Sequence, residues 1–210
     1  MNTERLEQSR RQSFIGMHSN NNVTYAMQYK RAFDSLYESS NPIDTISLPM
    51  MFLMRHYLEL ILKYNIKYFS EFSDSTFMLG KIKSEHKLKP LAEGFQQHWK
   101  IVVKKYNIEI NDEEYISNFE SLIELLDNID KYSMSFRYSH TKDDDKHFEW
   151  NDTLDIYSIK ILLDKVTPLL DYSSDVFNNQ VGQYLKMEEE MQKEMERELM
   201  SDMYNISNYQ

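Results

Sequence analysis

Four side chains with acid, base or charge chemistry interrupt an otherwise apolar stretch, residues 49–64. They are Arg55, His56, Glu59 and Lys63, and we call them the polar seam. At about 100° per residue they fall within one sector of about 100° on a helix. Buried charges need partners, because an unpaired one costs several kcal/mol. Two interpretations stay open: Arg55–Glu59 and Glu59–Lys63 are i,i+4 ion pairs that position helices, or the seam holds a ligand.

Two further segments could complete a site with the polar seam. Residues 86–89 have the sequence HKLK, and residues 136–140 have the sequence FRYSH. Imidazole groups exchange protons near neutral pH, and guanidinium or ammonium groups bind phosphate oxygens. For Arg137 the alternative is a purely structural bond to Glu59 or to a helix end. The candidate residues in the two segments are His86, Lys89, Arg137, Tyr138 and His140.

Helical periodicity dominates the elements that must position these residues. The sequence predicts helices over residues 23–38, 49–69, 90–106, 111–129 and 152–178. Pro49 suits the first turn of the second helix, with Ser47 or a neighbour as its cap. Between residues 134 and 150 the periodicity is lost, and two short runs around a charged tip favour a small β-hairpin. The predicted fold class is all-α, an up-and-down helical bundle.

The chain divides into three predicted parts. Residues 1–22 mix charged and Asn-rich sequence and predict a flexible arm, residues 23–178 form the bundle, and residues 179–210 form an acidic, Met-rich helix and tail. Tyr184 and several methionines lie along one side of that last helix. The helix over residues 183–200 either packs on its own domain or serves as a dimer contact or protein-binding helix.

Composition excludes several classes of function. Four Gly and four Pro in 210 residues leave no glycine-based nucleotide cradle, and a count of zero Cys removes thiolate metal sites. The run 143–145 of three Asp lacks the spacing of an EF-hand, so neither a metal nor another cofactor is predicted. With a net charge of −10, the protein would need a local basic patch to bind RNA. Apolar runs are too short for a membrane span, and the lack of Cys fits a reducing cytoplasm.

Three motifs together resemble a known family. RHYLELILK at 55–63, HKLKPL at 86–91 and FRYSH at 136–140 occur in this order in a helical chain. The combination resembles bacterial HEPN-like proteins over residues 23–178. The resemblance implies a small up-and-down helical bundle that is commonly a homodimer. Many HEPN proteins are metal-independent RNA endonucleases of antiviral-defence or toxin–antitoxin systems, and others are non-catalytic modules that bind a ligand or a protein.

The resemblance also implies roles for the candidate residues. Arg137 would hold the scissile phosphate, and His140 or His56 would take the proton of the 2′-hydroxyl. Arg55 would stabilise the developing charge. Arg137 and His140 stand closer together than the arginine and histidine of the typical HEPN ribonuclease motif. A non-catalytic ligand- or protein-binding module is the alternative function, and a phage-encoded inhibitor that mimics nucleic acid is a less favoured one. Five residues are expected either to bind substrate or to have a structural role in or beside the polar seam. They are Glu59, Lys63, His86, Lys89 and Tyr138.

Overall fold

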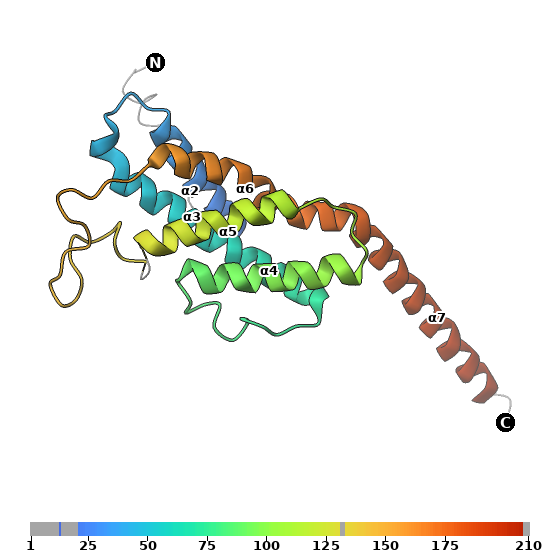
Figure 1. Ribbon diagram of the computed structural model, residues 1–210. Helices are drawn as coiled ribbons and strands as arrows, with labels where there is room; N and C mark the ends of the chain where they lie inside the picture. Colours follow the sequence, from blue (N-terminus) through green and yellow to red (C-terminus); the bar gives the residue numbers. More distant parts are fainter. Residues whose placement is uncertain (1–12, 14–20, 131–132, 208–210) are drawn as a thin grey trace, which may run out of the picture.

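Helices make up the regular structure of the described chain. A computed structural model describes residue 13 and residues 21–130 and 133–207. Figure 1 shows helices laid against one another as a bundle, and the predicted all-α class is confirmed. In chain order the elements are α2 (Asn22–Tyr37), α3 (Ile43–Ser73), α4 (Leu88–Lys105), α5 (Glu113–Ile129), α6 (Ile156–Phe177), the π-helical segment η2 (Asn178–Gly182) and α7 (Gln183–Ser207).

The long helix α3 is the centre of the bundle. Helices α2, α4 and α6 all pack on it, and α5 packs on both α6 and α4 (Figure 1). Between Met50 and Phe69 its apolar side chains are buried on several faces, because neighbours cover the helix from different sides. The ring centre of Phe69 lies 5.1 Å from that of Trp99 on α4 and 6.1 Å from that of Phe177 on α6. Aromatic contacts of this kind join three helices into one core.

Helix α3 begins earlier than the sequence predicts. Its first residue is Ile43, with Pro42 at the N-cap, and Pro49 lies inside the helix rather than in its first turn. The predicted cap near Ser47 is therefore wrong. A proline inside a helix removes the hydrogen bond to the carbonyl four residues earlier. Here that carbonyl belongs to Thr45, which is exposed, so water can take the place of the missing donor.

An irregular loop replaces the predicted β-hairpin between α5 and α6. Within the described residues 133–155 the pairing is limited to one isolated antiparallel bridge, between His140 and Lys146. A hydrogen bond of 3.1 Å from the His147 N–H to the Ser139 carbonyl flanks the bridge. A two-stranded ribbon is marginal in water unless a third strand or a packed face supports it, and the hairpin prediction is wrong for that reason.

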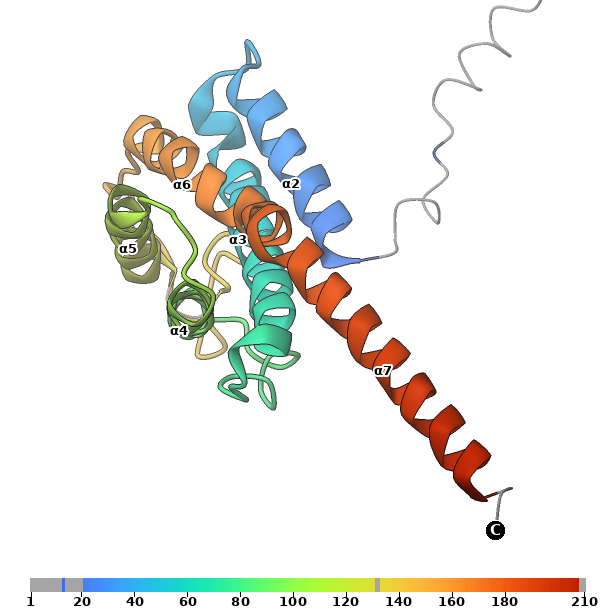
Figure 2. The same ribbon diagram turned by 90° about the vertical axis from the view of Figure 1, so that its right-hand side faces the viewer.

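The two ends of the bundle differ from each other. The predicted arm over residues 1–22 lies outside the described residues except for residue 13 and the start of α2. There Asn21 caps the helix by accepting a 2.9 Å hydrogen bond from the Thr24 N–H. At the other end α6 runs through η2 into α7, which projects away from the bundle (Figure 2). None of the helices in the described ranges has the length and apolar character needed to cross a membrane.

Candidate functional site

Arg55 lies at the centre of a buried network on α3. Its Nε is 2.8 Å from the Asp130 carboxylate and its Nη1 is 3.4 Å from that of Glu59. Its Nη2 donates to the backbone carbonyl of His86 at 2.6 Å and to the hydroxyl of Ser133. Arg55 is 5% exposed, and burial lowers its pKa although the Asp130 and Glu59 carboxylates act in the opposite direction. Most of its N–H groups are therefore engaged inside the protein.

The same network fixes two loops against α3. Asp130 Oδ1 accepts hydrogen bonds from the backbone N–H groups of Met134, at 2.8 Å, and Ser135, at 2.9 Å. The Ser133 hydroxyl donates a 2.7 Å hydrogen bond to the carbonyl of His86. The end of α5, the loop that follows it and the entrance of α4 consequently meet at one point on α3. Neither Asp130 nor Ser133 was among the residues predicted for the site.

Glu59 joins two cationic or imidazole groups to this network. Its Oε1 is 2.9 Å from Lys63 Nζ and 2.9 Å from His86 Nδ1. Burial by itself would raise the pKa of Glu59, but the hydrogen bonds and charges of Lys63 and His86 outweigh it, and the pKa is lowered. An ionised carboxylate only accepts hydrogen bonds, so His86 Nδ1 carries the hydrogen. Nε2 of this exposed ring is then the nitrogen that can exchange a proton with a bound molecule.

His56 lies beside the network between two aromatic rings. The Tyr29 ring meets it edge to face with centres 4.4 Å apart, and the Phe52 ring stacks on it at 5.7 Å. Burial lowers the pKa of His56 below its ordinary value of 6.5, although the Glu59 carboxylate acts in the opposite direction. The imidazole is therefore neutral at pH 7, which is the form that accepts a proton.

A hollow of about 230 Å³ brings most of these residues together. We call it the histidine pocket, because His56 and His86 both line it. Arg137 lies on its wall and is exposed, and its Nη2 contacts the Met134 sulfur at 2.9 Å. The cavity brings three residues of the polar seam together with His86 from residues 86–89 and with Phe136 and Arg137 from residues 136–140. Its lining residues are Phe52, Arg55, His56, Glu59, His86, Asp130, Ser133, Phe136 and Arg137.

Four of the predicted site residues lie outside the histidine pocket. Lys63 reaches it only through Glu59, and Lys89 is exposed in the first turn of α4. Tyr138 and His140 line two separate hollows farther along the loop. Across residues 21–130 and 133–207, no group of three or more His, Asp or Glu side chains is placed to hold a metal ion.

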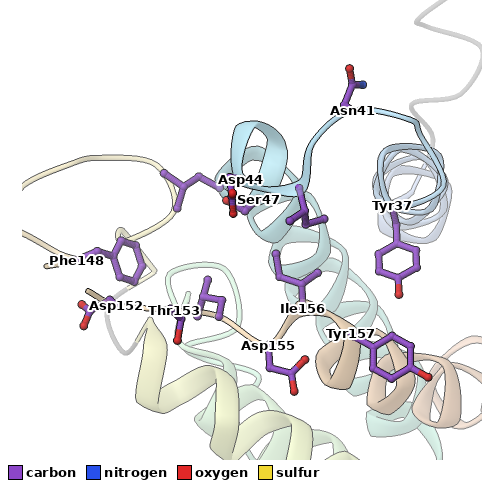
Figure 3. A pocket seen from close by; sticks show the side chains of 13 residues that line it. Tyr37, Asn41, Asp44, Ser47, Phe148, Asp152, Thr153, Asp155, Ile156 and Tyr157 are labelled. Carbon is purple, nitrogen blue, oxygen red and sulfur yellow. The ribbon is translucent and has the colours of Figure 1, made fainter. Parts of the chain in front are cut away.

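A larger hollow of about 870 Å³, which the sequence did not indicate, lies between the start of α3 and the entrance of α6 (Figure 3). Its walls carry tyrosines and carboxylates. Asp155 is engaged as the cap of α6, accepting a 3.0 Å hydrogen bond from the Ser158 N–H. Asp152 accepts a 2.8 Å hydrogen bond from the Glu149 N–H. Because this hollow holds no histidine, lysine or arginine, the histidine pocket is the better candidate for chemistry.

No protein-family model, curated protein or solved structure matches the chain. The fold and the site together define the class of protein: an all-α bundle with a buried arginine–carboxylate network next to a pocket that contains two histidines. The resemblance to HEPN proteins stays a prediction.

Glu59→Gln tests the charge of this network through the dependence of stability on pH. A folded-state pKa below the ordinary 4.5 means that Glu59 stabilises the fold above pH 4.5 and that this stability is lost as pH falls through the folded-state pKa. The variant should be less stable than the parent by about 2 kcal/mol at pH 7. The difference should shrink below pH 4.5, which urea unfolding at a series of pH values would measure. A constant difference at all pH values would contradict this origin.

Proposed function

We propose that the protein is a metal-independent RNA endonuclease whose active site is the histidine pocket. The observation that carries the proposal is that one small cavity collects His56, His86 and Arg137. Two imidazoles and a cation can supply the base, the acid and the charge stabilisation for intramolecular cleavage of RNA. The resemblance to HEPN proteins supports the same activity, with antiviral defence or a toxin–antitoxin pair as its setting.

The proposed reaction transfers two protons around one phosphorus. Neutral His56 takes the proton of the 2′-hydroxyl, and the 2′-oxygen forms a bond to phosphorus. The bond from phosphorus to the 5′-oxygen breaks, and that oxygen takes a proton from the ring of His86. Arg137 binds the phosphate oxygens during the step. The products are a 2′,3′-cyclic phosphate and a 5′-hydroxyl.

The experiment is incubation of the purified protein with cellular RNA and with tRNA in excess EDTA. The expected result is cleavage with 2′,3′-cyclic phosphate and 5′-hydroxyl ends, read by end labelling. Arg137→Ala should slow cleavage by about tenfold or more, because one charge-assisted contact to the phosphate is lost. Lys100→Ala is the matched control, since Lys100 is exposed on α4 and does not line the histidine pocket. Intact RNA with the parent protein would favour the alternative, a non-catalytic binding module.

We propose in addition that α7 forms a homodimer contact. Its row of exposed apolar side chains is nearly symmetric about Lys193, so an antiparallel pair of α7 helices would place like against like. Glu188 and Glu198 lie on the same face as the row. Buried carboxylates weaken such a contact, so the dimer should dissociate on dilution. The facing pairs are Tyr184 with Met203, Met187 with Leu199, and Met191 with Met195.

Met191→Lys should convert this dimer to a monomer. The lysine would bury a charge in the contact, which costs several kcal/mol. Light scattering should give twice the chain mass of 25.3 kDa for the parent at high concentration and the chain mass itself for the variant. Met200→Lys is the control, because nine residues, about 900°, place Met200 on the opposite side of α7. Equal masses for the parent and Met191→Lys would contradict the contact.

A further inference from the structure

Exposed aromatic and cationic side chains gather on the loop beside the histidine pocket. Trp150 is 98% exposed and Tyr138 is 54% exposed, whereas the other tryptophan, Trp99, is 2% exposed in the core. A fully exposed tryptophan is unusual in a protein without a partner, because the ring loses a large burial energy. The guanidinium of Arg137 lies 5.4 Å from the centre of the Tyr138 ring. The loop therefore presents flat rings and a cation on one surface.

This surface is continuous with the histidine pocket. Phe136 and Arg137 line both that pocket and a second hollow of about 280 Å³. The second hollow shares Leu48, Ser139 and Phe148 with a third one of about 970 Å³. Phe136 and Phe148 stack with ring centres 6.0 Å apart and hold the loop over the bundle. Three neighbouring hollows thus lie in a row between the two histidines and Trp150, and we call this row the loop groove.

The groups along the loop groove suit a polymer with alternating phosphates and planar rings. His140 and Lys146 line its far end, where both offer hydrogen-bond donors and Lys146 carries a positive charge. Asp44 and Glu149 line the same hollow, and their two carboxylates outweigh the single charge of Lys146. Ring stacking on Trp150 must consequently supply much of the affinity. Stacking needs bases whose faces are open, and a duplex hides its base faces.

We propose that the loop groove binds single-stranded RNA beyond the bond cut in the histidine pocket, with a base stacked on Trp150. This inference rests on the proposed function for the identity of the polymer. Binding of a 2′-O-methyl 12-mer, which has no free 2′-hydroxyl and cannot be cleaved, separates the groove from the reaction. Its affinity is measured by fluorescence anisotropy of a dye on the oligonucleotide.

Trp150→Ala should weaken binding of the single-stranded 12-mer by about tenfold, as loss of one stacked base predicts. Trp150→Phe should recover most of the affinity because it keeps a ring. Tyr172→Ala should leave binding unchanged, since this tyrosine is 58% exposed on α6 and lines none of the three hollows. The same 12-mer in a duplex should bind the parent more weakly than the single strand and without dependence on Trp150.

The possible results separate the groove from the activity. Equal affinities of the parent and Trp150→Ala for the single strand would overturn the groove, even if the parent cleaves RNA. A Trp150-dependent affinity together with RNA that stays intact in the cleavage assay would support the groove and contradict the proposed reaction. Equal dependence on Trp150 for single strand and duplex would overturn the assignment to single strands.

Discussion

Replacing His86 by alanine is expected to slow RNA cleavage at pH 7 by about a hundredfold or more, which is the rate enhancement that one proton-transfer group usually contributes. The Glu59 carboxylate, 2.9 Å from Nδ1, holds the ring so that Nε2 is the exchangeable position. His56→Ala removes the other proton-transfer group and should cost a similar factor. Single-turnover rates with saturating enzyme are the measurement, because they report the chemical step separately from product release.

His140→Ala distinguishes the two assignments of the catalytic histidine. The motif FRYSH predicts His140 as a proton acceptor, whereas the cavity that holds Arg137 contains His56 and His86. His140 lines the third hollow with Lys146, so its loss should raise KM and leave kcat near the parent value. A hundredfold loss of kcat in His140→Ala, with full activity in His86→Ala, would restore the assignment from the motif.

The pH profile gives a second check on His56. Burial between Tyr29 and Phe52 lowers its pKa below 6.5, so the proton-accepting form persists as pH falls from 7 to 6.5. On the acid side of the profile, cleavage by the parent should therefore decline below pH 6.5. Tyr29→Ala opens one face of the ring to water, which moves the pKa of His56 upward and shifts the acid limb of the profile to higher pH.

The sequence was sufficient to predict the polar seam, because the seam depends on local spacing. Arg55, Glu59 and Lys63 are four residues apart in a helix, and both of the i,i+4 ion pairs are present in the structure. The apolar residues around them required a buried helix at the centre of the fold. No distant contact had to be known for either conclusion.

The partners that complete the site could not be predicted from spacing. Asp130 is the C-cap of α5, and an acidic residue at a helix end is ordinarily a solvated one. Its role depends on packing that brings it to Arg55, which lies more than seventy residues earlier in the chain. The sequence predicts a substrate-binding or structural role for His86, and the hydrogen bond between His86 and Glu59 gives His86 a proposed part in proton transfer. Long-range contacts of this kind are set by tertiary structure.

His98 shows the same limit in the core. A histidine on a predicted amphipathic helix is most simply interpreted as a surface or helix-face residue, yet His98 is 0% exposed. Its Nε2 lies 2.9 Å from the Phe77 carbonyl and its Nδ1 lies 2.7 Å from the Ser73 hydroxyl. The carbonyl only accepts, so Nε2 carries the hydrogen of that bond. Both hydrogen-bond partners of His98 lie outside its own helix, so the sequence pattern of that helix could not predict them.

Arg55→Met is expected to lower the free energy of unfolding by about 3 to 5 kcal/mol, because it leaves the buried carboxylates of Asp130 and Glu59 without their shared cation. Asp130→Ala should cost a comparable amount, since it removes that cation's partner and also frees the N–H groups of residues 134 and 135. Urea unfolding followed by circular dichroism at pH 7 measures both. The double variant should cost less than the sum of the two single variants, because each already breaks the same bond.

Lys105→Met provides the comparison for an ion pair at the surface. Lys105 pairs with Asp74 at 2.5 Å, but Asp74 is exposed, and such pairs contribute less than about 1 kcal/mol to the free energy of unfolding.

A loss of stability confined to Arg55→Met and Asp130→Ala would mean that Arg55 holds the walls of the histidine pocket in place and acts on RNA only through them. If Arg55→Met instead kept the parent's stability and lost cleavage, the guanidinium would have to contact the substrate itself, as the resemblance to HEPN proteins implies. The stability measurement thus decides between the two interpretations that the spacing of the polar seam left open.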